Sequence, residues 1–187
     1  MARRAVGDDG RPRNAPLPLA VDDVAEIARF ERKVVRGPAP GDCWIWTGAL
    51  GDDGYGRFWL KRDGVVRVVQ PARFAVALYV GPVLGGLVAM HDRCDNPVCV
   101  RAATVGGHRP HVVMGTQREN LTSMTEKGRG QGGRPVWQHD GLTRAERVAR
   151  SQALRAAVRG GWNADAVHAA LLPSRPSLFS EPEDWST

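Results

Sequence analysis

The chain has 187 residues, among them 26 Lys or Arg and 20 Asp or Glu, with a formal charge of +6 and a pI of about 9.9. This length suits one domain with tails, or one domain with a small appendage, and the basic balance favours a polyanionic partner such as nucleic acid. No apolar run approaches the ~20 residues that cross a bilayer, and none resembles the core of a secretion signal, so we expect no membrane partner and a cytoplasmic location.

The N-terminal half predicts a disordered basic arm, two short helices and several strands. Residues 1–20 are rich in Arg, Gly and Pro and predict the arm. Apolar residues at helical spacing predict helices over 22–36 and 72–80, each followed by Gly-Pro. Alternating or β-branched runs separated by Gly-Asp-Asp-Gly and Arg-Asp-Gly predict strands at 44–47, 55–61 and 65–69.

The second half predicts a strand, a long loop, a second strand and a helix. The apolar run 87–90 leads into His91, and 111–114 is the second strand. Thr116 with Glu119 three residues later has the pattern of a capping box that begins the helix. Beyond it we expect a linker, two helices with a Gly-Gly connection, and a tail, at 131–141, 142–159, 164–172 and 173–187.

The three cysteines predict a metal site. Cys94 and Cys99 flank four residues, His111 follows Cys99 after eleven others, and Cys43 is a distant further candidate. An odd number of clustered cysteines in a cytosolic chain favours metal binding over disulfides, and three thiolates with one imidazole make a closed tetrahedral zinc site. The alternative is that the cysteines are small buried apolar residues. Spacing leaves His108 and His91 open as rivals of His111.

Three further residues have the chemistry of phosphodiester hydrolysis. His91 ends one strand and can deprotonate water near neutral pH. Asn120, in the first turn of the helix after the second strand, offers an oxygen to Mg²⁺, and a strand–loop–strand–helix unit brings the two positions together. The guanidinium of Arg73 suits a phosphate. Singly, each has a structural alternative.

The stretches CWIWTGA, HDRCDNPVC and HVVMGTQREN resemble the HNH endonucleases of phages and actinobacteria, over roughly residues 29–130. The region is also similar to the His-Cys-box homing endonucleases, in which the metal-binding asparagine lies nine residues after the zinc histidine, as Asn120 does after His111. The resemblance implies an α+β fold with a ββα-metal core over 21–130, an N-terminal β-hairpin region and a C-terminal helical pair. It also implies structural Zn²⁺, catalytic Mg²⁺ that Mn²⁺ can replace, and these site residues: zinc ligands Cys43, Cys94, Cys99 and His111, general base His91, Mg²⁺ sites Asn120 and His91, and phosphate contact Arg73.

Three departures from the family pattern weaken the expectation of full activity. Ala72 stands where the family usually has a histidine before the arginine. Two residues instead of one separate His91 from Cys94, and the loop between Cys99 and His111 is longer than usual.

The last two predicted helices suggest a second contact with DNA. Within 142–159 there are five arginines and one acidic residue, and Arg144, Arg147, Arg155 and Arg159 fall within roughly 120° on a helical wheel. A solvated basic face is the alternative. Trp137, Trp162 and Phe179 are candidates for a small core of this helical pair.

The leading hypothesis is a Mg²⁺-dependent endonuclease that acts on double-stranded DNA in a bacterial or phage-infected cell. A zinc-stabilised DNA-binding or packaging-accessory module with little or no nuclease activity is the alternative, and Ala72 favours it. A zinc-containing interaction scaffold is a third reading. Because one active centre cuts one strand, a homodimer is a further partner to consider, as is the phage packaging machinery.

Overall fold

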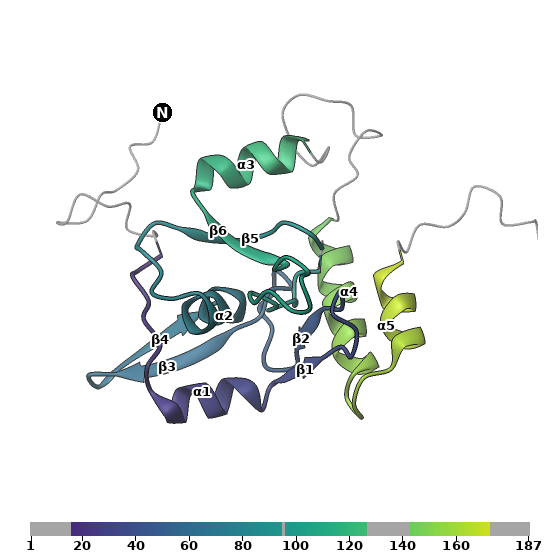
Figure 1. Ribbon diagram of the computed structural model, residues 1–187, viewed down its shortest axis with the longest axis horizontal. Helices are drawn as coiled ribbons and strands as arrows, with labels where there is room; N and C mark the ends of the chain where they lie inside the picture. Colours follow the sequence, from purple (N-terminus) through teal and green to yellow (C-terminus); the bar gives the residue numbers. More distant parts are fainter. Residues whose placement is uncertain (1–15, 95, 127–142, 173–187) are drawn as a thin grey trace, which may run out of the picture.

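The computed structural model describes residues 16–94, 96–126 and 143–172, which form an α+β fold with three two-stranded antiparallel sheets (Figure 1). In chain order the elements are α1 (Val24–Glu31), β1 (Val34–Arg36), β2 (Trp44–Trp46), β3 (Phe58–Arg62), β4 (Val65–Val69), α2 (Pro71–Tyr79), β5 (Val88–His91), β6 (Val112–Gly115), α3 (Gln117–Glu126), α4 (Arg144–Ala157) and α5 (Ala164–Leu171). Within these residues no helix is long and apolar enough to cross a membrane. The predicted linker and tail, with Trp137 and Phe179, lie outside the described residues.

The hairpin of β5 and β6, followed directly by α3, is the central unit. Val88 pairs with Gly115 and His91 with Val112, and α2 and α3 pack on opposite sides of the hairpin (Figure 1). The predicted capping box is present. The backbone N–H of Glu119 donates to Oγ1 of Thr116 (3.1 Å), and the backbone N–H of Thr116 donates to the Glu119 carboxylate (2.6 Å). This reciprocal pair fixes the start of α3 right after β6.

The first helix is shorter than the sequence predicts. Asp23 caps α1 by accepting hydrogen bonds from two backbone N–H groups, and the helix ends at Glu31. Residues 34–36, expected to continue the helix, form β1 instead and pair with β2. Their β-branched valines suit a strand, and the partner strand, which lies further along the chain, decides between the two conformations.

An aromatic cluster holds α1, β2, β3 and α2 together. Phe30, Trp46, Phe58 and Phe74 are each at most 2% exposed, and their neighbouring ring centroids lie 4.8–5.8 Å apart. Such pairs add roughly 0.5–1.5 kcal/mol each beyond the burial of their area. This core supports α2, which in turn supports the β5–β6 hairpin.

The β3–β4 hairpin closes as predicted, through a tight turn at Asp63 (φ 52°) and Gly64 (φ 75°), two consecutive left-handed residues that match the twist of the strands. Strand β3 begins at Phe58, whereas the sequence predicted a strand from residue 55. Residues 51–55 form a turn of their own, in which Gly51 N–H donates to the carbonyl of Tyr55 (2.8 Å).

Residues 16–20, predicted to be the end of a disordered arm, pack against the domain. Leu19 is 4% exposed, and its backbone exchanges two hydrogen bonds with Val83 (2.9 and 2.8 Å). The rest of the predicted arm, residues 1–15, lies outside the described residues.

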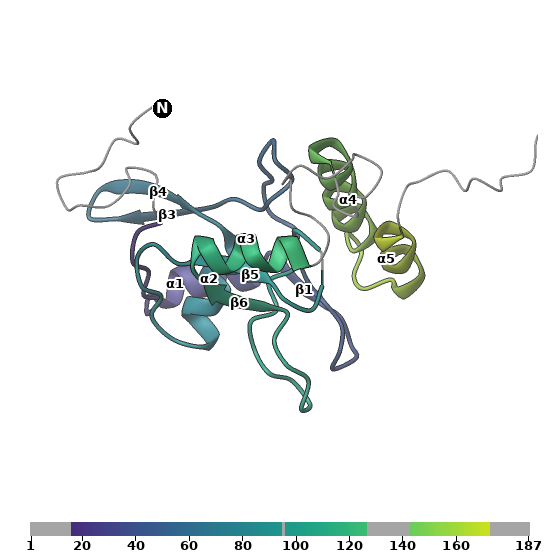
Figure 2. The same ribbon diagram turned by 90° about the horizontal axis from the view of Figure 1, so that it is seen from above.

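Helices α4 and α5 lie to one side of the other elements (Figure 2) and contribute residues to the main buried core. Leu154, Val158 and Val167 belong to the same buried cluster as the residues of β2 and α2, and Trp162 packs against it. A capping box between Thr143 and Glu146 begins α4, and Asn163 caps α5.

The arginine arc predicted to face DNA instead attaches α4 to the body of the protein. Arg144 forms an ion pair with the Asp52 carboxylate. Nε of Arg147 donates to the carbonyl of Asp53 (2.7 Å), and Nε of Arg155 donates to the carbonyl of Thr47 (3.3 Å). These three arginines therefore connect α4 to the loop that follows β2, and a contact between this face and DNA stays a prediction.

Candidate metal centre and active site

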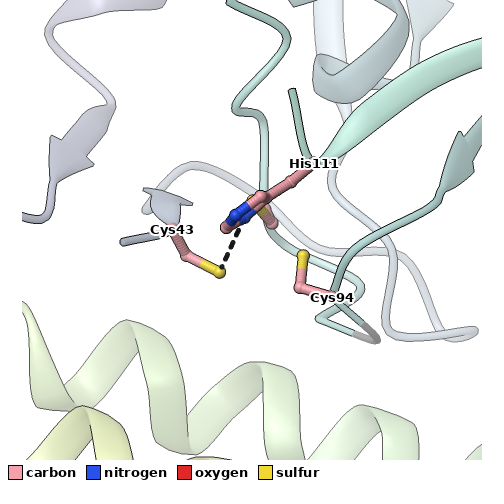
Figure 3. A group of neighbouring side chains, drawn as sticks. Cys43, Cys94 and His111 are labelled. Carbon is pink, nitrogen blue, oxygen red and sulfur yellow. Dashed lines mark hydrogen bonds between the residues drawn. The ribbon is translucent and has the colours of Figure 1, made fainter. Parts of the chain in front are cut away.

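The four predicted metal ligands lie together at the base of the hairpin. One ligand atom from each of Cys43, Cys94, Cys99 and His111 lies within 4.8 Å of the others. Figure 3 shows the side chains of Cys43, Cys94 and His111 converging on one point. Nδ1 of His111 is 3.5 Å from the Cys43 sulfur and 3.6 Å from the Cys99 sulfur. With Zn–S near 2.3 Å and Zn–N near 2.0–2.1 Å, a tetrahedral zinc places sulfur and nitrogen roughly 3.5 Å apart. The described cluster therefore has the dimensions and the donor set of a metal site.

Backbone pairing brings Cys43, far away in sequence, to the other ligands. Cys43 directly precedes β2, and residues 98–100 lie antiparallel to that strand. Trp46 N–H donates to the carbonyl of Val98 (2.9 Å), and Val100 N–H donates to the carbonyl of Trp44 (2.8 Å). These two bonds place Cys99, which is fully buried, beside Cys43.

The turn between Cys94 and Cys99 is held by Asn96, which is 0% exposed. Its side-chain oxygen accepts a hydrogen bond from Val98 N–H (3.0 Å), and its own carbonyl accepts one from Cys99 N–H (3.1 Å). The backbone N–H of Asn96 also donates to the Cys94 thiol, which favours the thiolate. The Asn-Pro turn thus orients both cysteines towards one point.

Without a cation, one of the three cysteines is favoured as a thiolate and the other two are favoured as neutral thiols. Hydrogen bonds from Cys94 and Cys99 strongly lower the pKa of Cys43, against the effect of its burial. The hydrogen bond to the Cys43 thiolate raises the pKa of Cys94 to about 12. Burial, and then contact with Cys43, raises the pKa of Cys99 well above its ordinary value. A divalent cation would stabilise all three thiolates at once.

Arg101 lies on the far side of the His111 ring and is 1% exposed. Its Nη1 donates to Nε2 of His111 (2.7 Å), which leaves Nδ1 as the nitrogen that faces the sulfurs. Its described partners are this ring nitrogen and the carbonyl of His108 (3.1 Å), not a carboxylate. A buried guanidinium needs a compensating charge, and Zn²⁺ with three thiolates carries one net negative charge, so the arginine fits a loaded cluster.

The structure also decides between the three candidate histidines. His111 is 8% exposed and belongs to the cluster. His108 is exposed on the loop beyond Arg101, and His91 ends β5 without joining the cluster. The long loop between Cys99 and His111 folds as a two-stranded finger that projects from the body (Figure 2), so the extra residues leave the ligand geometry intact.

His91 and Asn120 come from elements that touch. Both side chains are half-buried, and α3 contacts both strands of the hairpin. His91 pairs with Val112 across the hairpin, so their side chains share a face. Asp92, the next residue, follows the end of β5 and is exposed. The base and Mg²⁺ roles of His91 and Asn120 stay predictions.

Arg73 has internal partners. It is 5% exposed, its Nε donates to the carbonyl of Leu87 (3.2 Å), and its Nη2 donates to the carbonyl of Leu84 (3.1 Å). These bonds hold the segment that leads into β5. The guanidinium thus binds the segment before β5, and a direct contact between Arg73 and a phosphate stays a prediction.

We therefore expect Arg73→Ala to lower the free energy of unfolding by about 2–3 kcal/mol, because it removes a buried side chain and its hydrogen bonds to the carbonyls of Leu84 and Leu87. Arg32→Ala, at an exposed arginine, should stay within about 0.5 kcal/mol of the wild type. Urea unfolding of both variants measures the difference. Wild-type stability in Arg73→Ala, with loss of activity alone, would contradict the structural role.

The chain is similar to two proteins of Escherichia phage T7. It is 38% identical to Protein 7.7 over 88 residues, which are 47% of this chain and 58% of that protein. It is 33% identical to Protein 2.8 over 95 residues, which are 49% of this chain and 55% of that protein. The matched region thus spans less than two thirds of either relative. No family model and no solved structure matches the chain.

Proposed function

We propose that the chain is a metal-dependent DNA endonuclease that hydrolyses phosphodiester bonds. The observation that carries this proposal is the order of parts around the cysteine–histidine cluster. A strand ending in His91 enters the cluster, β6 leaves it, and a capped helix with Asn120 in its first turns follows at once. This is the order that the HNH resemblance implies, and a ββα unit braced by a metal is a compact way to hold a base and a cation ligand near one phosphate.

The cluster itself has a structural role in this proposal. Thiolates with imidazole in tetrahedral arrangement favour zinc over hard cations such as Mg²⁺. All four positions come from protein side chains, so a bound zinc has no open position for water or substrate. Zinc here stabilises the loop between β5 and β6 and keeps the two strands in register.

His91 and Asn120 are the residues that carry out the hydrolysis in this proposal. The imidazole of His91 takes a proton from the attacking water, the role of a general base that histidine fills most often. The amide oxygen of Asn120 suits a hard cation, and α3 holds it against the hairpin. Mg²⁺ bound there would neutralise charge on the phosphate and the leaving oxygen. Mn²⁺, which accepts the same oxygen donors, can replace it.

Zinc-loaded protein incubated with supercoiled plasmid tests the proposal. We expect nicked and linear DNA with Mg²⁺ or Mn²⁺ and none when the protein is exchanged into buffer without divalent cations. Omission of the cation is a better control than EDTA, because a chelator also attacks the cysteine–histidine cluster. Binding of duplex DNA without cutting in either metal would contradict the enzyme.

That outcome would instead support a zinc-stabilised DNA-binding or packaging-accessory module. The specific observation in its favour is Ala72, which is 8% exposed within α2 and offers no imidazole beside Arg73. Both candidates suit a phage protein acting in an infected cell, which the likeness to two T7 proteins supports.

A further inference from the structure

A basic pocket of about 710 Å³ lies on the outer side of the metal cluster, between the finger loop and residues 39–41. Its lining consists of three arginines, two histidines and three glycines, with no acidic residue among them. The arginines are Arg93, Arg101 and Arg109. None of the roles assigned above to the metal cluster or the hairpin uses Arg93 or Arg109.

Backbone hydrogen bonds and a tight turn fix the wall of the pocket that the finger loop forms. Val105 and His108 exchange two backbone hydrogen bonds (3.2 and 2.9 Å) around Gly106 and Gly107. Both glycines have left-handed backbones (φ 53° and 77°), and a Cβ on Gly106 would lie 2.9 Å from Cβ of Pro40. The turn therefore requires glycine for its conformation and for its close contact with Pro40.

Arg101 ties this finger to the metal cluster. Through one guanidinium group it donates to the carbonyl of His108 and to the ring of His111. Arg101 is 1% exposed, so it contributes positive charge to the wall of the pocket, and the exposed arginines are the candidates for direct contact with a ligand. Arg93 and Arg109, both exposed, stand at the rim of the pocket.

We propose that this pocket binds a phosphate group of the DNA backbone. Guanidinium groups match phosphate oxygens in bidentate geometry, and glycine backbones allow close approach of an anion. Arg93 follows the candidate base His91 by two residues, so a phosphate held here belongs to the same stretch of DNA as the bond that is cut. The inference rests on the proposed function and adds to it a positioning contact made by the unusually long loop.

The test compares Arg93→Gln/Arg109→Gln with the control Arg32→Gln/Arg67→Gln, which removes the same charge from exposed residues outside the pocket. Binding of a short fluorescent duplex is measured by anisotropy without Mg²⁺, between about 50 and 200 mM salt. Each phosphate contact contributes a slope of about 0.9 to log K against log salt. Because the pocket is proposed to hold one phosphate, we expect the pocket variant to lose about 1 from this slope and the control to keep it.

Each remaining outcome overturns a defined claim. Equal loss in both double variants would mean that the pocket contributes bulk charge only. An unchanged slope in the pocket variant, with normal cutting, would reject the pocket and leave the nuclease standing. Wild-type protein that binds no duplex at any salt would reject both proposals, and a slope change seen with RNA alone would reject DNA as the source of the phosphate.

Discussion

Loss of the metal is expected to unfold the segment between β5 and β6 and to lower the stability of the whole domain. Cys99 is 0% exposed, and the pairing of residues 98–100 with β2 depends on the turn that the cysteines close. Zinc binding in small domains contributes about 10–16 kcal/mol of apparent free energy that counts directly towards folding. This chain has an aromatic core of its own, so we expect a smaller loss of about 5 kcal/mol, or roughly 10–20 °C in Tm.

Elemental analysis and thermal unfolding measure this effect. Freshly purified protein should carry one zinc per chain, and Cys99→Ser should lose both the zinc and the stability. Val98→Ala, at a neighbouring residue that is 1% exposed, is the matched control, because it removes buried apolar atoms and leaves all four ligands. Substoichiometric zinc, or a Tm that EDTA does not change, would count against the structural metal.

The members of the cysteine–histidine cluster could be predicted because three of them lie in one short stretch with distinctive spacing. The Asn-Pro turn between Cys94 and Cys99 and the nine-residue step from His111 to Asn120 are both visible in the sequence. The choice among the three histidines is not, because it depends on the register of β5 with β6. The bond from Arg101 to His111, which turns Nδ1 towards the sulfurs, is a tertiary contact of the same kind.

The arginines show where local patterns are insufficient. A helical wheel places Arg144, Arg147 and Arg155 on one face, but it cannot say what that face meets. In the structure they meet residues of the loops around β2. Arg73 likewise serves carbonyls more than ten positions away. Meanwhile the basic pocket is assembled from segments around residues 41, 93 and 101–111, so no single stretch of sequence predicts it.

Replacement of His91 by alanine is expected to reduce plasmid cleavage by about 10²–10⁴-fold, the usual contribution of a general base. The variant Asp92→Asn should be measured beside His91→Ala, because the number of residues before Cys94 leaves two candidate positions for the base. The family separates its base from that cysteine by one residue, and in this chain the residue so placed is Asp92, not His91. His91 is the last residue of β5 and is half-buried, whereas Asp92 follows the strand and is exposed, so the two side chains lie in different surroundings.

Initial rates of nicking by His91→Ala, Asp92→Asn and wild type, each with Mg²⁺ in excess and one zinc per chain, separate the possibilities. If His91 is the base, His91→Ala loses activity and Asp92→Asn stays within a few-fold of wild type. If Asp92→Asn loses activity and His91→Ala keeps it, Asp92 is the general base. The extra residue before Cys94 would then accompany a change of base from imidazole to carboxylate. Because carboxylic acids lose their proton at lower pH than imidazolium does, the acidic limb of the pH–rate profile would then lie at lower pH, and this is a second measurement of which side chain accepts the proton.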